Sequence, residues 1–210
     1  MSELLENIGI NLQNGKAKIV QQLVRQALDE GMDAMTVLEQ GLLPGMAIIG
    51  EKFKNNEIFV PEVLVSARAL NKGTAILKEK LVGEGFEEKG TVILGTVKGD
   101  LHDIGKNLVG MMMESKGLKV IDLGVDVEAD KFVAAAKENN ADIVALSALL
   151  TTTMSEMKGI IEAVRAECPN VKFMVGGAPV SPAFAENIGA TAYTDDAASA
   201  AEQALALCAL

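Results

Sequence analysis

The amino-acid sequence predicts an α/β protein in two parts: a helical bundle over residues 1–88, and a five-stranded parallel sheet with helices on both faces over residues 89–210. As far as about residue 82, apolar residues recur at helical spacing and no strand pattern is evident. Residues 83–90, GEGFEEKG, are polar and glycine-rich, which is typical of a linker. Short apolar strands then alternate with helices, which is typical of a doubly wound sheet with right-handed crossovers.

The helical part is expected to hold four or five helices. Asn14 is the expected N-cap of a helix that Gly31 ends, and Asp33 is expected to cap the next one. An interruption is expected near Pro44-Gly45, and Pro61 suits the first turn of a long amphipathic helix. Because these helices can bury their apolar stripes only against one another, they predict a small antiparallel bundle.

The second part alternates strand and helix from its first residues to its last. The expected strands are 91–97, 118–122, 142–147, 171–175 and 191–194, and the expected helices are 104–116, 128–139, 153–166, 182–188 and 196–208. Apolar residues run almost without interruption through the first strand, as in a strand that is covered on both faces. Since parallel strands point the same way, the loops that follow them gather at one edge of the sheet.

The composition excludes several classes of protein. A net charge of -10, with 29 acidic and 19 basic residues and no Lys/Arg cluster, argues against a nucleic-acid partner. Cys168 and Cys208 have no CxxC partner, so neither a disulfide framework nor a zinc site is expected. No uninterrupted apolar stretch is long enough to span a membrane, and the N-terminus lacks a signal-like pattern, so we expect a cytoplasmic protein without membrane contact.

The chain's only histidine lies in the loop after the first strand, in the segment GDLHDIGKN. Asp100, His102 and Gly105 form the pattern D-x-H-x-x-G at the edge where such sheets bind ligands. A single histidine excludes a polyhistidine metal site but leaves one axial metal bond open, with Asp100 as the carboxylate that accepts the other ring N–H. A surface or core role for His102 is the alternative.

Three other loops at this edge are unusual. Ser147, with Thr151 to Thr153, forms a hydroxyl cluster, of which at least one member is expected to cap a helix. Gly176-Gly177 indicates a tight turn and does not complete a GxGxxG phosphate fingerprint. Residues 193–197 form a weaker fourth segment.

GDLHDIGKN, SALLTTT (147–153), GGAPVS (176–181) and the upstream EKFKNNEIFVPEVLVSARAL (51–70) together resemble the cobalamin-binding region of methionine synthase and the stand-alone corrinoid proteins of methyltransferase systems. The resemblance covers nearly the whole chain. It implies a flavodoxin-like sheet that binds cobalamin, and a helical cap that covers the upper face of the cobalt.

The resemblance also implies roles for individual residues. His102 ligates cobalt in place of the cofactor's own benzimidazole, Asp100 is hydrogen-bonded behind it, and Thr153 stands where the family places a serine. The corrinoid contacts implied on the sheet part are Asp100, His102, Asp103, Ile104, Gly105, Ser147, Leu149, Thr151, Thr153, Gly176, Gly177, Ala178, Tyr193 and Ala197. The contacts implied on the cap are Phe53 and Val60, where methionine synthase has aromatic and leucine-like residues.

The implied function is that of a methyl carrier between a substrate methyltransferase and an acceptor methyltransferase, for example one that acts on tetrahydrofolate, with a reductive activase as a third partner. The chain would not complete a catalytic cycle alone. The methyl donor stays open among methoxyaromatic compounds, methanol, methylamines and betaine. Rival interpretations are a corrinoid-based sensor, the small subunit of a cobalamin-dependent mutase, and a phosphorylated receiver that uses Asp100 or Asp103.

Overall fold

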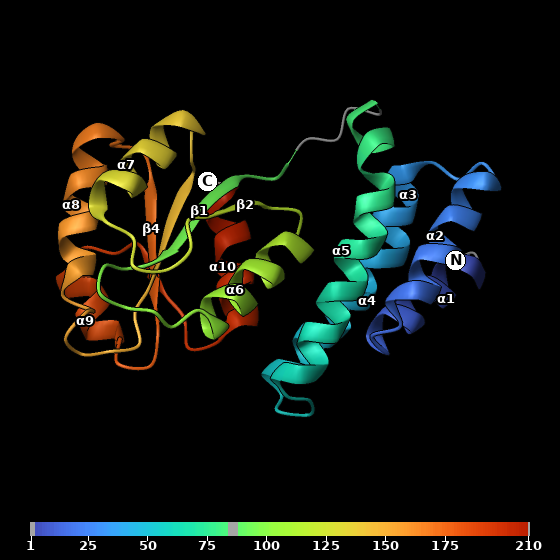
Figure 1. Cartoon of the computed structure of the whole chain (residues 1–210), viewed down its shortest axis with the longest axis horizontal. Helices are drawn as coiled ribbons and strands as arrows, with labels where there is room; N and C mark the ends of the chain where they lie inside the picture. Colours follow the sequence, from blue (N-terminus) through green and yellow to red (C-terminus); the bar gives the residue numbers. More distant parts are fainter. Residues whose placement is uncertain (1–2, 84–87, 210) are drawn as a thin grey trace. The chain divides into compact units, whose positions relative to one another are not determined.

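The computed structural model describes residues 3–83 and 88–209, which fall into two compact units, Met1–Glu87 and Glu88–Leu210 (Figure 1). The centre of the expected linker, residues 84–87, lies outside the described residues. In the described parts of the chain, every helix is too short or too polar to span a lipid bilayer.

The first unit consists of helices that bury a shared apolar core. Its elements are α1 (Glu3–Gln13), α2 (Ala17–Asp29), α3 (Ala34–Val37), the π-helix η1 (Leu38–Leu42), α4 (Leu43–Lys54) and α5 (Val60–Gly83). The long helix α5 packs mainly against α2, and α1 packs against α2 and α4. Leu12, Val24, Leu42, Met46 and Leu77 are fully buried where these helices meet. The helical bundle predicted from periodicity is therefore present.

The helix ends agree only in part with the sequence predictions. Asp33 caps α3 by accepting a hydrogen bond from the backbone N–H of Thr36 (2.7 Å), as predicted, and Gly31, at φ +87°, follows the end of α2. The prediction that Asn14 caps α2 is wrong. Its side-chain amide instead donates to the carbonyl of Ile10 (2.8 Å) within the last turn of α1, and Lys16 occupies the N-cap position without a side-chain hydrogen bond.

The interruption expected near Pro44-Gly45 lies just before the proline, and it is a π-helix instead of a non-helical break. The chain continues from α3 through the π-helix η1 into α4, and the proline lies in the first turn of α4, where no backbone N–H is required. Gly45 serves helix packing, because a Cβ there would lie 2.9 Å from the carbonyl oxygen of Gly9 in α1.

The second unit is a five-stranded, fully parallel sheet, as the sequence and the resemblance predict, and its strand order is β2-β1-β3-β4-β5. The strands are β1 (Thr91–Thr96), β2 (Lys119–Asp122), β3 (Ile143–Ser147), β4 (Lys172–Gly176) and β5 (Ala192–Tyr193). The helices are α6 (Ile104–Ser115), α7 (Ala129–Glu138), α8 (Glu156–Glu167), α9 (Pro182–Asn187) and α10 (Ala197–Cys208).

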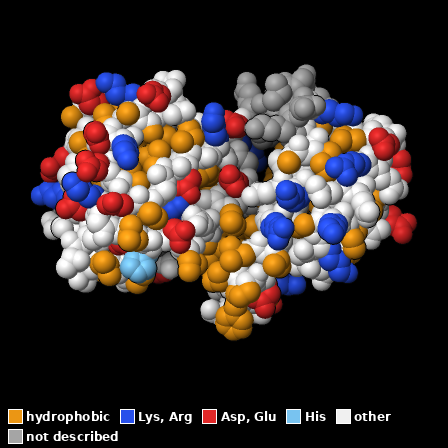
Figure 2. Space-filling view, viewed as in Figure 1, with side chains coloured by type: hydrophobic (Ala, Val, Ile, Leu, Met, Phe, Trp, Pro, Cys, Tyr) orange, Lys and Arg blue, Asp and Glu red, His pale blue; other side chains and the backbone are white. Residues whose placement is uncertain are grey.

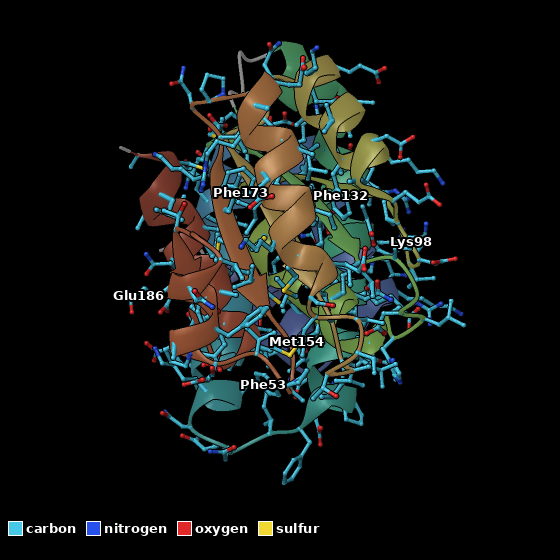
Figure 3. All side chains as sticks on the ribbon, turned by 90° about the vertical axis from the view of Figure 1, so that its left-hand side faces the viewer. Phe53, Lys98, Phe132, Met154, Phe173 and Glu186 are labelled. Atoms are coloured by element: carbon cyan, nitrogen blue, oxygen red, sulfur yellow. The ribbon has the colours of Figure 1, made fainter. Side chains whose placement is uncertain are left out.

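Helices cover both faces of this sheet. On one face α6 packs against α10, and on the other α7 packs against α8 (Figure 1). Phe132 of α7 and Phe173 of β4, which lie on either side of α8 in the view of Figure 3, are fully buried in the core of the second face. Because β1 and β3 are neighbours in the sheet, the loops that follow them meet at its carboxyl edge, where the strand order reverses.

One local difference from the sequence prediction affects the site. The helix expected from residue 153 begins at Glu156, and residues 151–155 form turns instead. This arrangement leaves Thr153 in the loop after β3, where its side chain is free to bond outside a helix. The expected first strand also ends one residue early, since Val97 forms only an isolated bridge to Val127.

Candidate functional site

The candidate site lies at the carboxyl edge of the sheet, where the loops after β1 and β3 meet. Residues 97–103 connect β1 to α6 and hold Asp100 and His102. Residues 148–155 connect β3 to α8 and hold Leu149 and Thr153. Both loops follow strands whose side chains are almost entirely buried, so the core fixes the positions from which the loops begin.

Asp100 is the centre of this site. Its side chain is fully buried, whereas that of His102 is 51% exposed. One carboxylate oxygen, Oδ1, accepts hydrogen bonds from the ring Nδ1 (2.7 Å) and the backbone N–H (3.1 Å) of His102. The other, Oδ2, accepts from the backbone N–H groups of Leu149 (2.7 Å) and Leu150 (3.3 Å) and from the hydroxyl of Thr153 (2.8 Å). The carboxylate thereby ties together two loops that are 50 residues apart in sequence.

These hydrogen bonds keep Asp100 ionised. Burial alone would raise the pKa of its carboxyl, but the backbone N–H of Leu149, the His102 ring, the Thr153 hydroxyl and the His102 backbone together hold that pKa well below its ordinary value. An ionised carboxylate can only accept hydrogen bonds, so the proton between the two side chains belongs to Nδ1 of His102. In the neutral ring, Nε2 then carries a lone pair, and it belongs to a side chain that is half exposed.

Thr153 is the third residue in the hydrogen-bonded series that runs from His102 through Asp100. Its side chain is buried, and its hydroxyl also lies 3.1 Å from the carbonyl oxygen of Leu150. A hydroxyl has one proton to donate, and the charged carboxylate of Asp100 is both the nearer and the stronger acceptor. The hydroxyl predicted from the resemblance is therefore in hydrogen-bonding contact with Asp100.

The surface beside His102 is apolar. Leu101 and Ile104, which flank the histidine in the chain, are 72% and 69% exposed, and Leu149 and Leu150 of the facing loop are also exposed. In the described sheet unit these are the large hydrophobic side chains with the greatest exposure. Hydrophobic side chains lie next to the histidine ring at the surface (Figure 2). Such a patch fits a flat, largely apolar ligand whose centre is bound by Nε2.

Two glycines at this edge are not explained by the packing of the protein. A Cβ on Gly105 in the first turn of α6, or on Gly176 at the end of β4, would meet no atom within 4 Å. Gly177 is different, because it has φ +125° and a Cβ there would lie 1.8 Å from the carbonyl oxygen of Ala148. The fold itself requires Gly177, whereas Gly105 and Gly176 leave open backbone that a large ligand can approach. The residues present therefore fit the corrinoid that the resemblance implies.

The structure distributes the other predicted site residues along the same edge. Ser147 ends β3 in register with Thr96 and Gly176, while Thr151 and Ala178 are exposed in the loops that follow. Asp103 occupies the N-cap position of α6 without capping it, and accepts a hydrogen bond from Asn107 (3.2 Å).

The last strand contributes a residue with a polar partner. Tyr193 in β5 donates its hydroxyl proton to Asp195 (2.6 Å), which raises the pKa of the tyrosine. Ala197 begins α10 and is buried. In the helical unit, Phe53 lies in the last turn of α4 and Val60 begins α5, both half-buried.

Three residues of the site were not predicted from sequence. Lys106 in α6 is almost fully buried, and its ammonium group donates to Asn107 (2.7 Å) and forms an ion pair with Asp122 at the end of β2. Asp126, in the loop between β2 and α7, accepts a hydrogen bond from the backbone N–H of Gly99 (2.7 Å). The signal in the sequence was the segment DLGVDV (122–127), which places one carboxylate at the end of a strand and a glycine and a second carboxylate directly after it.

Comparison with known proteins agrees with these features. Residues 90–206 match a family described as B12 binding domain, and residues 4–78 match a second family with the same description. The chain is 42% identical over 206 residues to a corrinoid protein of Desulfitobacterium hafniense, covering 96% of this chain and 95% of that protein. It is 39% identical to dimethylamine corrinoid protein 1 of Methanosarcina acetivorans, with 96% of each chain covered.

A solved structure is similar as well. The methanol:cobalamin methyltransferase complex from Methanosarcina barkeri contains a chain that matches with a TM-score of 0.91 and 31% identity, covering 100% of this chain and 81% of that one.

Proposed function

The chain belongs to the cobalamin-binding corrinoid proteins of methyltransferase systems, and from this premise we propose that it is a methyl carrier whose corrinoid is ligated from below by His102. The observation that carries the proposal is the hydrogen-bonded series Thr153, Asp100, His102, which leaves Nε2 of a half-exposed ring available to bind a metal. With a corrinoid bound, His102 would take the place of the cofactor's own benzimidazole at the cobalt. A bound corrinoid supplies a cobalt centre that accepts a methyl group from one partner and releases it to another.

The chain's own residues orient and tune the ligand. Asp100 accepts the hydrogen bond from Nδ1–H of His102, so it selects the tautomer whose Nε2 has a free lone pair and fixes the orientation of the ring. Thr153 donates to the other carboxylate oxygen and, together with the N–H of Leu149, keeps Asp100 ionised. Because Asp100 is buried and bonded on both oxygens, the ring has one preferred orientation.

We assign the remaining residues of the edge to the cofactor. Leu101, Ile104 and Leu149 would offer their exposed apolar side chains to a bound corrin, and Asp103 and Gly105 would border it. The displaced nucleotide tail needs hydroxyl partners and close backbone approach. The residues proposed to line its slot are Ser147, Thr151, Gly176, Gly177, Ala178, Tyr193 and Ala197.

We assign the upper face of the corrinoid to the helical unit, through Phe53 and Val60. A cover of this kind excludes water but has to move when a partner reaches the cobalt. Since the relatives are named for dimethylamine and trimethylamine systems, and the matching solved structure is a methanol:cobalamin methyltransferase complex, a substrate methyltransferase is the first proposed partner. An acceptor methyltransferase, for example one that uses tetrahydrofolate, and a reductive activase are the others.

The carrier function can be tested by transfer of a labelled methyl group. The full chain, loaded with cobalamin and reduced, would be methylated with radiolabelled methyl iodide and mixed with purified methyltransferases from dimethylamine, trimethylamine and methanol systems together with their cognate acceptors. We expect the label to stay on the protein when no enzyme is present, and to leave it when one of these enzymes and its acceptor are added. Retention of the label with every enzyme would contradict a carrier and favour a sensor. Failure to bind cobalamin would contradict both.

A further inference from the structure

The loop between β2 and α7, residues 123–128, is hydrogen-bonded to the backbone of residues 96–100, which lead into and begin the loop that contains His102. The N–H of Gly99 donates to the carboxylate of Asp126 (2.7 Å), and the N–H of Asp126 donates to the carbonyl of Asp100 (3.0 Å). The next residue, Val127, donates to the carbonyl of Thr96 (3.0 Å). Asp126 therefore bonds on both sides of the peptide group that joins Gly99 to Asp100.

Asp126 adopts a conformation that is uncommon for a residue with a side chain. Its φ is +53°, and the Gly99 that it binds has φ +78°. Aspartate tolerates the left-handed region better than most residues, but a non-glycine residue occupies it only where neighbouring interactions stabilise it. Here that conformation directs the backbone N–H and the carboxylate of one residue toward the same segment of a neighbouring loop.

Asp100 is thus held from two directions by two loops. The loop after β3 binds its carboxylate through Leu149 and Thr153, and Asp126 binds its backbone. The position of the carboxylate relative to β3 depends on both, because a carboxylate that shifts with its backbone cannot reach the same donors. Farther along the loop, the hydroxyl of Thr96 donates to the carbonyl of His102 (2.9 Å).

We propose that Asp126 is a positioning residue for the axial histidine: by holding the Gly99–Asp100 peptide, it keeps Asp100 where it can accept the Nδ1 proton and present Nε2 of His102 to a bound corrinoid. The cofactor part of this inference rests on the proposed function. Asp126 itself does not touch the corrinoid in this account. Asp126 instead increases the fraction of bound corrinoid that is ligated by His102.

Three substitutions separate the contributions of the carboxylate. Asp126→Asn keeps an oxygen acceptor and tolerates the left-handed region, Asp126→Gly keeps the conformation but removes the acceptor, and Asp126→Ala removes both. Asn140→Gly is the matched control, because Asn140 also has a positive φ (+47°) but lies between α7 and β3, at the opposite edge of the sheet.

In the cobalamin-loaded full chain, absorption spectra at one fixed pH give the ratio of histidine-ligated to unligated corrinoid. We expect Asp126→Gly to lower this ratio about fivefold, the effect of losing about one hydrogen bond, and Asp126→Ala to lower it further. Asp126→Asn should restore most of the wild-type ratio, and Asn140→Gly should not change it. A wild-type ratio in Asp126→Gly, or an equal loss in Asp126→Asn, would overturn the proposal.

Amide hydrogen exchange in the cofactor-free protein tests the same inference without the corrinoid. We expect Asp126→Gly to accelerate exchange at Gly99 and also at His102 and Leu149, whose N–H groups bond to Asp100. Faster exchange at Gly99 alone would mean that Asp126 positions nothing beyond its own partner, and would overturn the proposal. If wild-type protein binds no cobalamin, the proposed function fails, while this measurement still decides the role of Asp126.

Discussion

Replacing Asp100 by asparagine removes the charge that organises the site while keeping the size of the side chain. An amide has one oxygen, so it cannot accept from both sets of donors. If its oxygen faces Leu149 and Thr153, its NH2 group meets the backbone N–H of His102 and displaces the ring proton from Nδ1 to Nε2. If it is reversed, the NH2 group meets the N–H of Leu149.

Either orientation leaves at least one donor without its acceptor beside a fully buried side chain. Each such loss costs about 1 to 3 kcal/mol, so we expect Asp100→Asn to lower the free energy of unfolding of the sheet unit by at least about 1 to 3 kcal/mol. Asp142→Asn is the matched control. That exposed carboxylate accepts one hydrogen bond, from the N–H of Thr91 (2.8 Å), and an amide oxygen can replace it at a cost below about 1 kcal/mol.

The difference in unfolding free energy between wild type and Asp100→Asn should decrease as the pH falls. Because folding lowers the pKa of Asp100, its contribution to stability is complete above the ordinary carboxyl pKa of about 4 and is lost as the pH falls through the folded value. Wild type and Asp100→Asn should therefore converge below about pH 4. Urea unfolding followed by fluorescence of Tyr193, the only tyrosine in a chain without tryptophan, reports on the sheet unit.

Two results would refute the reasoning. One is an Asp100→Asn protein that is as stable as wild type at neutral pH. The other is a stability difference between the two proteins that stays constant from about pH 5 to about pH 3. A constant difference would mean that the pKa of Asp100 is the same in the folded and unfolded proteins, so that its negative charge does not stabilise the fold.

Other substitutions test individual contacts of the site. Thr153→Val should destabilise the sheet unit by about 1 to 2 kcal/mol in urea unfolding, while Thr153→Ser, which keeps the hydroxyl, should be close to wild type. Gly177→Ala should cost more than about 2 kcal/mol, because its Cβ has no room, whereas Gly105→Ala should leave the stability unchanged or slightly higher and weaken cobalamin binding in a titration. Asp122→Ala should destabilise more than Lys106→Met, since only the first leaves a buried ammonium without its counter-ion; the opposite order would contradict this interpretation of the pair.

The sheet could be predicted from sequence because each of its strands has a local pattern of apolar residues that identifies it. Nearly continuous apolar runs such as residues 92–94 indicate strands covered on both faces, and the helices between them imply parallel pairing. Asp33 was predicted correctly as a cap because its partner, Thr36, is only three residues away. Asn14 was not, since a polar residue between two helices can bond backward as well as forward, and here it closes α1.

The contacts that were missed depend on residues distant in the chain. The start of α8 was placed too early because the Thr153 hydroxyl bonds to a carboxylate 53 residues away and leaves the helix pattern. Asp126 and Lys106 bond to partners 27 and 16 residues away. The segment DLGVDV (122–127) signals a polar loop after a strand, but no local pattern identifies these distant partners. The resemblance named His102, Asp100 and Thr153, and the structure adds the loop that binds the backbone of Gly99 and Asp100.

The axial ligand can be identified without any substitution, because the chain has a single histidine. Protein expressed without a histidine tag and labelled with ¹⁵N only in histidine would be loaded with unlabelled cobalamin and reduced to the paramagnetic Co(II) state. Electron paramagnetic resonance then reports the nucleus bound below the cobalt. We predict that the axial nitrogen splitting changes from a triplet in unlabelled protein to a doublet in labelled protein, since ¹⁵N has a smaller nuclear spin than ¹⁴N. A triplet in the labelled protein would show that the benzimidazole remains bound, and would contradict ligation by His102.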